Sequence, residues 1–266
     1  MKIGILGCAG RMGQMLVQQI LATDGAELAG GTEAPGSAAV GQDIAGLAGF
    51  DASGIVVGDD ARALFEGSDV VIDFTVPAAT ADHARMASGT GTAWIVGTTG
   101  LSAAQQDLIA QAAAKAAVVQ AANFSVGVNL LLGLTEQVAG ALGDDYDIEV
   151  IEMHHRHKVD APSGTALALG EAAAAGRGVD LGAVSQRGRD GHTGPRRAGD
   201  IGFATLRGGD VAGDHTVLFA GDGERVELTH KAGSRAVFAS GAVRAALWTE
   251  GRAPGLYSMR DVLALA

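Results

Sequence analysis

The chain begins Met1-Lys-Ile-Gly-Ile-Leu-Gly-Cys-Ala-Gly-Arg-Met-Gly13, and this opening stretch indicates the fold. Lys2 to Leu6 is a short apolar run with β-branched residues, which predicts a buried strand. Glycines at positions 7, 10 and 13 follow at once and lead into a segment with helical spacing. Because glycines in such a turn let backbone N–H groups approach a pyrophosphate at the positive end of a helix, the stretch predicts a dinucleotide-binding turn.

The glycine pattern is a variant of the commonest one. Ala9 stands where G-x-G-x-x-G has its second glycine. A tight turn that serves only packing is therefore an alternative interpretation. The predicted strand before the turn and the predicted helix after it favour nucleotide binding.

Short apolar runs alternate with longer alanine-rich segments through the first half of the chain. Predicted strands are Lys2 to Leu6, Glu27 to Gly31, Ile55 to Val57, Val70 to Phe74, Ala93 to Val96 and Ala117 to Gln120. Predicted helices are Arg11 to Ala22, Ala79 to Ala87 and Ser102 to Lys115, the last with Ser102 as its N-cap. Apolar strands that alternate with helices indicate a parallel sheet covered on both faces. The expected fold class is α/β, with a doubly wound Rossmann-type domain.

The order of elements changes after Asn123 to Gly127. The segments predicted there are a helix at Val128 to Leu142, a strand at Ile148 to Met153, a helix at Thr165 to Ala174, strands at Ile201 to Arg207, His215 to Ala220 and Arg225 to His230, and a helix at Ser234 to Thr249. Consecutive strands without helices between them indicate a mixed or antiparallel sheet in a second, α+β domain. We predict residues 1–125 plus 235–266 as one domain and 126–234 as the other, with hinges at 125–127 and 232–234.

The composition limits the possible partners. The 266 residues include 19 Lys and Arg against 30 Asp and Glu, a formal net charge of −11, and a single cysteine, Cys8. Nucleic acid is not expected as a partner, because its phosphates require a basic face. One cysteine excludes an internal disulfide, which suits a reducing compartment, so a cytoplasmic location is expected. No membrane association is expected either, because the apolar run at the N-terminus is short and nothing later reaches membrane length.

Glu33 bears on the choice of cofactor. It lies about 20 residues beyond Gly13, at the end of the second predicted strand, where an acid accepts hydrogen bonds from an adenosine ribose diol. Ala34 follows it, where an arginine would help to hold a 2′-phosphate, and only Arg11 lies nearby. These residues predict NADH as the preferred cofactor, with NADPH as an alternative. A solvated loop acid is the other interpretation of Glu33.

Two further segments are candidates for contact with a nicotinamide. Gly97-Thr-Thr-Gly100 and Ala121-Ala-Asn-Phe124 each follow a predicted parallel strand. The carboxyl ends of parallel strands form the edge at which open α/β sheets bind ligands. Ordinary turn chemistry explains both segments equally well from the sequence alone.

The second half holds a concentrated basic cluster in an acidic chain. His154-His-Arg-His-Lys158 is followed by Pro162-Ser-Gly-Thr165, a predicted helix entrance with Ser163 as its cap. Backbone N–H groups at Gly164 and Thr165 can seat a carboxylate, and Lys158 and His154 can each supply a proton. The cluster predicts a small anionic substrate. A solvated charged face is the alternative interpretation.

A metal site is a second alternative for this cluster. Three histidines with Glu152 and Asp160 nearby could hold zinc, but the spacing matches no H-E-x-x-H pattern, so no metal is expected. His192, His215 and His230 are isolated in the sequence and are interpreted as structural, hydrogen-bonded histidines. In an extended strand His154, Arg156 and Lys158 would face one way and His155 and His157 the other, unless the strand ends there.

Several motifs together resemble the 4-hydroxy-tetrahydrodipicolinate reductase family, formerly called dihydrodipicolinate reductase. They are Gly7 to Gly13, Val71-Ile-Asp-Phe-Thr75, Gly97 to Gly100, Ala121 to Asn129, His154 to Thr165, Gly202-Phe-Ala-Thr-Leu-Arg207 and Ser240-Gly-Ala-Val-Arg-Ala-Ala-Leu-Trp248. The resemblance runs nearly end to end. It implies NAD(P)H-dependent reduction of a cyclic dicarboxylic imine on the route to diaminopimelate and lysine, and a homotetramer built by the second, substrate-binding domain.

The resemblance also implies roles for individual residues. It makes His154 and Lys158 the proton donors, and His155, Gly164 and Thr165 the substrate contacts. The implied cofactor contacts are Gly7, Cys8, Ala9, Gly10, Arg11, Met12, Glu33, Gly97, Thr98, Thr99, Ala121, Ala122, Asn123 and Phe124. The alternatives to this function are a dehydrogenase acting on another small dicarboxylate or amino acid, a nucleotide-sensing regulator and a metal-dependent hydrolase.

Overall fold

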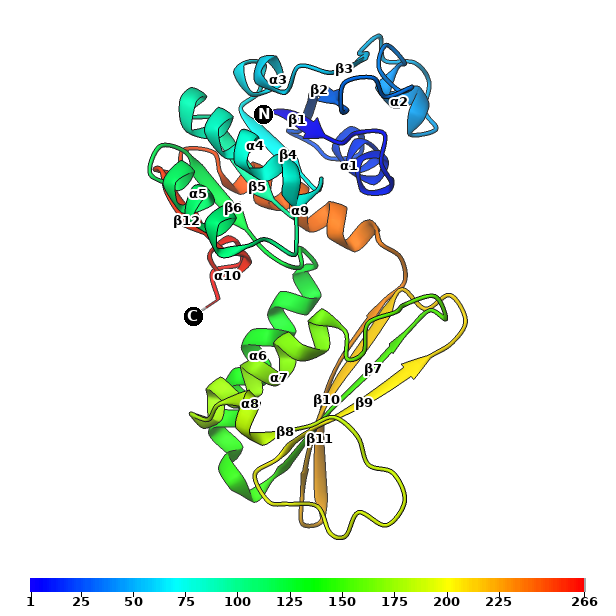
Figure 1. Ribbon diagram of the computed structural model, residues 1–266, viewed down its shortest axis with the longest axis vertical. Coiled ribbons are helices and arrows are strands. Elements are labelled where there is room, and N and C mark those ends of the chain that lie inside the picture. The colour runs from blue at the N-terminus through cyan, green and yellow to red at the C-terminus, as the bar shows by residue number, and fades with distance from the viewer. Residues whose placement is uncertain (266) are drawn as a thin grey trace. The chain divides into compact units, whose positions relative to one another are not determined.

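The computed structural model describes residues 1–265 and divides into two compact units (Figure 1). The first unit contains Met1–Val126 and Ala236–Ala264. The second contains Gly127–Arg235 together with Leu265. The division falls after residues 126 and 235, one residue later at each point than the predicted boundaries after 125 and 234. Leu265, predicted in the first domain, belongs to the second unit.

Seven parallel strands form the sheet of the first unit, in the order β12-β6-β5-β4-β1-β2-β3. The strands are β1 (Lys2–Leu6), β2 (Glu27–Thr32), β3 (Val57–Gly58), β4 (Val70–Asp73), β5 (Ala93–Val96), β6 (Ala117–Gln120) and β12 (Gly255–Tyr257). The helices are α1 (Arg11–Leu21), α2 (Ile44–Leu47), α3 (Ala61–Gly67), α4 (Pro77–Thr90), α5 (Ala103–Ala113), α9 (Ala236–Trp248) and α10 (Met259–Val262). The predicted Rossmann-type fold is confirmed, and the strand order reverses between β1 and β4.

Successive side chains of these strands enter two different cores. Ile3 and Ile5 of β1 pack in a cluster with α1 and α9, whereas Leu6 packs in a second cluster with α3, α4 and α5. In the same way Ile95 of β5 joins the first cluster, and Trp94 joins the second. Because alternate residues of a strand point to opposite faces, this near-continuous apolar pattern requires helices on both sides of the sheet.

Several elements of the first unit differ from the predictions. Helix α4 begins at Pro77 rather than Ala79, because proline is well suited to the first helical position, and it continues to Thr90. Strand β3 is Val57–Gly58 rather than 55–57. The seventh strand, β12, and helices α2, α3 and α10 are not predicted at all. The predicted cap of α5 is confirmed, because Ser102 and Gln105 form a capping box.

The second unit has a mixed five-stranded sheet in the order β11-β10-β7-β9-β8. Its elements are α6 (Val126–Leu142), β7 (Asp147–His154), α7 (Gly164–Arg177), α8 (Leu181–Val184), β8 (Ser185–Gln186), β9 (Ile201–Arg207), β10 (Gly213–Gly221) and β11 (Glu224–Ala232), with a 3-10 turn at Gly143–Asp145. Strand β10 is antiparallel to both β7 and β11, and β9 is parallel to β7 and β8. The expectation of a mixed sheet is confirmed.

The face of this sheet that packs on α6 and α7 is apolar at one end and polar at the other. On β7 the buried positions are Ile148, Val150, Glu152 and His154. On β10 they include His215, Val217 and Phe219, which pair with Glu152, Val150 and Ile148 in turn. The apolar end forms the core with α6 and α7. The polar end brings titratable side chains together under the start of α7.

Helix α6 is both long and apolar. The segment Val126–Asp145 is long and apolar enough to cross a membrane by length and composition alone, a property that core helices share. The expectation that nothing later in the chain reaches membrane length is therefore wrong for this segment. Its Leu131 and Ala139 are buried in the core of the second unit, whereas Leu130 and Leu134 are exposed.

Candidate active site

The glycine-rich turn has the backbone geometry that dinucleotide binding requires. Gly7 has a φ of +71°, a conformation that glycine adopts readily and other residues avoid. A Cβ at Gly13 would lie 2.2 Å from the Gly7 carbonyl oxygen, so helix α1 can approach the end of β1 only through a glycine. Gly10 is the N-cap of α1 and has no side chain to occupy the first-turn N–H groups. The turn therefore leaves the positive end of a helix accessible to an anion.

Glu33 is held against this turn. Its Oε1 accepts a hydrogen bond from the Ala9 backbone N–H at 2.8 Å, which fixes the carboxylate beside the loop that follows β1. The Gly7 and Cys8 backbone N–H groups donate to the Thr32 carbonyl oxygen and tie the same loop to the end of β2. The carboxylate thus lies at the end of β2, beside the glycine-rich turn.

Cys8 turns its side chain away from this edge. The thiol is buried, and burial, with the charge of Glu33 as a second cause, raises its pKa to about 11. A Cβ at Gly31 would lie 2.8 Å from the Cys8 sulfur, so the thiol packs directly against β2. Contact between Cys8 and a cofactor would therefore use its backbone atoms.

A buried carboxylate joins the loops that follow β4 and β5. Asp73, at the end of β4, accepts hydrogen bonds on Oδ1 from the Thr75 backbone N–H at 3.0 Å, the Thr75 hydroxyl at 2.6 Å and the Thr98 hydroxyl at 3.3 Å. Its Oδ2 lies 2.7 Å from His83 Nδ1 on α4. Desolvation acts to raise the pKa of Asp73, but the contacts with His83 and Thr75 outweigh it and hold that pKa below its ordinary value.

Aromatic packing joins the same loops to the one that follows β6. The rings of Phe74 and Phe124 lie 5.5 Å apart, centroid to centroid. A Cβ at Gly97 would lie 2.4 Å from the Phe74 ring, so this position accepts only glycine without rearrangement. The Ala121 backbone N–H donates to the Val96 carbonyl oxygen. The loops after three neighbouring strands therefore form one packed edge.

The predicted cofactor residues all come from one edge of the first sheet. They follow β1, β2, β5 and β6, which with β4 are consecutive in the strand order, at the ends where parallel strands all finish. The exposed members are Gly10, Arg11, Thr99 and Ala122. Asp73 and His83 also lie at this edge but are not among the predicted cofactor residues.

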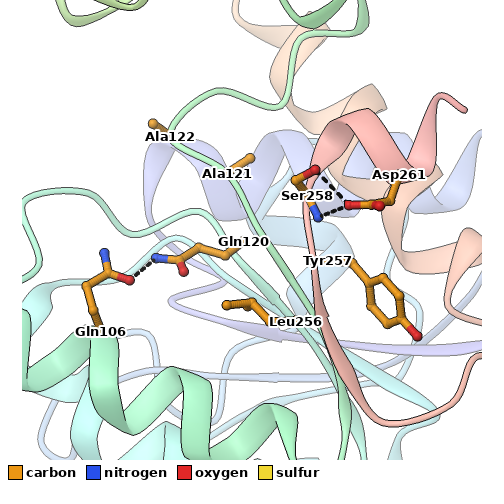
Figure 2. Close-up of a pocket in the computed structure, with 8 residues that line it drawn as sticks. All are labelled: Gln106, Gln120, Ala121, Ala122, Leu256, Tyr257, Ser258 and Asp261. Carbon is orange, nitrogen blue, oxygen red and sulfur yellow. Dashed lines mark hydrogen bonds between the residues drawn. The ribbon is translucent and has the colours of Figure 1, made fainter. Parts of the chain in front are cut away.

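An open pocket of about 500 Å³ lies at the β6–β12 side of this sheet (Figure 2). It is lined by Gln106, Gln120, Ala121, Ala122, Leu256, Tyr257, Ser258 and Asp261. Its polar side chains hold one another: Gln120 Nε2 donates to Gln106 Oε1, and the Ser258 hydroxyl and N–H donate to Asp261 Oδ2. The pocket shares Ala121 and Ala122 with the predicted cofactor residues, but its lining does not include the glycine-rich turn.

In the second unit, strand β7 ends within the basic cluster. His154 is its last residue, and Arg156 and His157 form a turn closed by a hydrogen bond from the Lys158 N–H to the His155 carbonyl oxygen at 3.1 Å. The alternation of sides expected for a continuing strand therefore stops at His154. His154 points to the buried face, whereas Arg156 and His157 are exposed.

Glu152 organises the buried end of this cluster. Its Oε2 lies 2.5 Å from His154 Nδ1, and Arg207 Nη1 and Nη2 donate to its two oxygens at 2.8 and 2.9 Å. Its Oε1 also accepts from the Ser163 backbone N–H at 3.1 Å. Desolvation acts to raise the pKa of Glu152, but the hydrogen bonds from Arg207, His154 and Ser163 outweigh it and hold that pKa below its ordinary value.

His215 belongs to the same group. Its ring lies 5.0 Å from that of His154, centroid to centroid, and its Nε2 lies 3.1 Å from the Ser163 hydroxyl. Burial lowers the pKa of His215 to about 4, and the nearby His154 adds to the effect. The interpretation of His215 as isolated is wrong, because the fold places it beside His154. Its hydrogen bond to Ser163 agrees with the predicted structural role.

Helix α7 begins at Gly164, one residue before the predicted start at Thr165, and its predicted cap is confirmed. Ser163 is the N-cap, and its hydroxyl accepts from the Ala166 backbone N–H at 3.2 Å. Gly164 and Thr165 are the first helical residues, so their N–H groups belong to the first turn of the helix, at its positive end. Gly164 is exposed, which leaves this positive helix end open to an anion.

Lys158 and His155 lie on the loop between β7 and α7. Lys158 Nζ forms an ion pair with Asp160 Oδ1 at 2.9 Å, which lowers the pKa of Asp160. Desolvation and then the charges of Arg235 and the other cluster residues lower the pKa of His155. The charge of Lys158 contributes to the lowered pKa values of both His155 and His215. The start of α7 is linked to His154 by Glu152, which contacts His154 Nδ1 and accepts from the Ser163 backbone N–H.

The arrangement does not resemble a metal site. Among residues 1–265, no group of three or more His, Cys, Asp or Glu side chains is placed to hold a metal ion. Glu152, one of the acids considered for zinc, is held by Arg207 instead. Arg207 and His215 are not among the residues predicted for the site. Strand periodicity is a signal for His215, which has the same alternation with Val217 and Phe219 that Glu152 has with Val150 and Ile148.

Comparisons with known proteins agree across both units. Residues 1–124 match the family model described as dihydrodipicolinate reductase, N-terminus, and residues 127–263 match dihydrodipicolinate reductase, C-terminus. The chain belongs to the dihydrodipicolinate reductase family. The resemblance found in the sequence is therefore confirmed.

Curated family members match the chain over its full length. A protein of Rhodopseudomonas palustris (strain BisA53) named 4-hydroxy-tetrahydrodipicolinate reductase is 56% identical over 265 residues, covering 100% of this chain and 97% of that protein. A protein of the same name from Ruegeria sp. (strain TM1040) is 56% identical over 263 residues, covering 99% and 98%.

Solved structures show the fold of the family. A dipicolinate-bound dihydrodipicolinate reductase from Paenisporosarcina sp. TG-14 matches with a TM-score of 0.77 and 24% identity, covering 98% of each chain. GenD2 from gentamicin A biosynthesis, solved in complex with NAD, matches with a TM-score of 0.59 and 15% identity, covering 100% of this chain and 90% of that one. Both likenesses support the fold described above.

Proposed function

We propose that the protein reduces 4-hydroxy-tetrahydrodipicolinate to tetrahydrodipicolinate, with loss of water and oxidation of NAD(P)H, in the synthesis of diaminopimelate and lysine. The observation that carries this proposal is the full-length match, at 56% identity, to proteins named for this reaction. The basic loop before α7 supports it, because a doubly negative ring needs both a cationic surrounding and N–H donors. The first unit would bind the dinucleotide and the second the substrate.

The glycine-rich turn and Glu33 would hold the cofactor. Its pyrophosphate would lie at the start of α1, and its ribose diol would donate to the Glu33 carboxylate. The bound cofactor supplies the hydride. The packed edge formed by Gly97, Phe74 and Phe124 would exclude water from the neighbourhood of the nicotinamide ring.

The second unit would hold the substrate and supply the proton. Gly164 and Thr165 would receive one carboxylate at the start of α7, and His155 would contact the ring's other polar groups. His154 and Lys158 would deliver the proton that accompanies hydride addition, one proton for each hydride. A proton donor on β7 beside a carboxylate seat on α7 keeps both at fixed positions on rigid elements.

The decisive experiment is an assay that follows NADH absorbance with enzymatically generated substrate. We expect oxidation of the cofactor only when protein and substrate are both present, and inhibition by pyridine dicarboxylates. A protein that binds NADH without turnover would instead be a nucleotide-sensing regulator. Turnover of other dicarboxylates or amino acids in preference to this substrate would favour a different dehydrogenase.

We also propose a preference for NADH over NADPH. The Glu33 carboxylate would repel a 2′-phosphate, and the exposed Ala34 beside it offers no charge to hold one. Arg11 is exposed at the start of α1 and supplies a positive charge there, so use of NADPH is expected to be weaker rather than absent. Comparing kcat/KM for the two cofactors tests this, and a higher value with NADPH contradicts it.

A homotetramer is the proposed assembly. Strand β11 is one of the two edges of the second sheet, and most of its residues are exposed, including Val226 at 36%. Open sheet edges of this kind favour pairing with another chain. Sedimentation of the purified protein checks the assembly. The cytoplasmic location expected from the cysteine content stays a prediction.

A further inference from the structure

We propose that Glu152 is the positioning residue of the substrate site and determines which nitrogen of His154 gives up the proton. This inference rests on the proposed role of His154. Glu152 is the one described carboxylate that contacts both the histidine, at 2.5 Å, and the backbone at the start of α7, at 3.1 Å. It therefore holds the proton donor and the carboxylate seat in a single hydrogen-bonded group.

The charge of Glu152 sets the tautomer of His154. Its pKa is lowered, so the side chain is a carboxylate at neutral pH and can only accept hydrogen bonds. His154 Nδ1, 2.5 Å away, must then carry a hydrogen in both the neutral and the protonated ring. The proton that leaves and returns is consequently the one on Nε2.

Arg207 stabilises this buried carboxylate and connects it to the loop between β7 and α7. The guanidinium donates to both oxygens of Glu152, whose side chain is 1% exposed. Arg207 Nη2 also donates to the Asp160 carbonyl oxygen at 2.6 Å. Asp160 in turn holds Lys158 Nζ at 2.9 Å. The same carboxylate–arginine pair is thus connected to the loop that presents the second candidate proton donor.

His215 and Gly213 fix the plane of the His154 ring. His215 meets that ring at 74°, edge to face, while its Nε2 contacts the Ser163 hydroxyl. Because that hydroxyl oxygen already accepts from Ala166 N–H, its hydrogen is available to the neutral His215 ring. A Cβ at Gly213 would lie 3.0 Å from His154 Nε2, so the ring rests directly on a glycine.

The central experiment compares Glu152→Gln with the matched control Glu149→Gln. Glu149 lies on the same strand and is also bound by arginines, Arg189 and Arg196, but it faces away from the buried side. An amide at position 152 can present its N–H₂ to Nδ1 and reverse the tautomer, so we expect kcat to fall by about 10² fold, with little change in NADH affinity. The pH dependence of kcat should also shift, whereas Glu149→Gln should stay within about twofold of the wild type.

A second measurement keeps the inference testable if Glu152→Gln does not fold. Nitrogen-15 spectra of histidine-labelled wild-type protein, with His154 assigned by comparison with His154→Gln, should show hydrogen on Nδ1 of the neutral ring. A neutral ring with hydrogen on Nε2 would overturn the proposal, as would unchanged kcat and pH dependence in folded Glu152→Gln. Wild-type protein without turnover would refute the proposed function, and the tautomer would still decide the position of the hydrogen.

Discussion

Each unit buries a carboxylate against a histidine, and the two pairs differ in what else holds the acid. Asp73 in the first unit lies 2.7 Å from His83 Nδ1, and Glu152 in the second lies 2.5 Å from His154 Nδ1. Both acids are at most 1% exposed. The remaining contacts of Asp73 come from neutral threonine groups, whereas Glu152 also accepts hydrogen bonds from the Arg207 guanidinium.

The difference indicates that the carboxylate–histidine pair has a different role in each unit. Asp73 and His83 link a helix to the loops that carry Thr75 and Thr98, so their contacts shape the edge where a dinucleotide would bind. In the second unit Arg207 already balances the acid, so His154 is not needed to neutralise it. A histidine that the fold does not require as a counter-ion can change its protonation during a reaction.

Removal of each histidine in turn tests whether the two pairs have different roles. His154→Ala should lower kcat by about 10² to 10⁴ fold, because a general acid is lost, while NADH binding changes little. His83→Ala should lower kcat by less than about tenfold, since it only disturbs loop positions. Steady-state kinetics and NADH titration check both variants. Similar losses of kcat in the two would remove the distinction between the pairs.

Replacing the acid of the first pair should affect stability more than chemistry. Asp73→Asn removes the charge from a buried group that accepts hydrogen bonds from Thr75 and Thr98 and contacts His83, and we expect the free energy of unfolding to fall by about 3 to 5 kcal/mol. Urea denaturation followed by circular dichroism measures this. Asp60→Asn sets the scale, because it alters only the exposed cap of α3 and should cost about 1 kcal/mol or less. Equal midpoints for the two variants would contradict a structural role for Asp73.

His215 distinguishes the second unit by its response to pH. Its pKa is lowered from 6.5 to about 4 in the folded chain. As pH falls from 6.5 towards 4, the unfolded chain binds a proton that the folded chain does not, so folding stability falls, by about 3 kcal/mol in all at about 1.4 kcal/mol per unit of pKa difference. His215→Gln should remove this dependence in urea titrations from pH 7 to 4. The exposed His192→Gln should retain it, and identical pH profiles for both would refute the assignment.

The smallest expected effect concerns Glu33 at the edge of the first unit. Glu33→Gln keeps the shape but removes the charge, so the KM for NADH should rise by about tenfold, the value of one hydrogen bond to a charged group. The KM for NADPH should change less, because repulsion of its 2′-phosphate is relieved. Glu27→Gln, at the exposed start of the same strand, should leave both KM values unchanged. A proportional rise for both cofactors would contradict a role in ribose selection.

Sequence patterns identify elements whose side chains repeat and miss those defined by distant partners. Strands β1, β4, β5 and β6 are predicted well because their apolar runs are nearly continuous. Strand β12 has only three residues, and its identity depends on pairing with β6. The contact of His83 with Asp73 depends on how α4 packs, which no local pattern specifies.

The second unit shows the same limit at the level of the site. The basic cluster and the cap at Ser163 can be predicted from the sequence because their residues are close together in the chain. Arg207 and His215 lie more than fifty positions from Glu152, and register across three strands brings them together. Strand periodicity could have suggested His215, since it places that residue on the buried face.

The first unit is assembled from both ends of the chain, and this has a consequence for synthesis on the ribosome. Strand β12 and helix α9 are translated after the whole of Gly127–Arg235. A nascent chain that has emerged only to Arg235 already contains every strand of the second sheet. At that point β6 still has an unpaired edge, and the residues that pack on α9, including Ile72 and Ile95, still lack that cover. Vectorial synthesis therefore supplies the second sheet in full before the first.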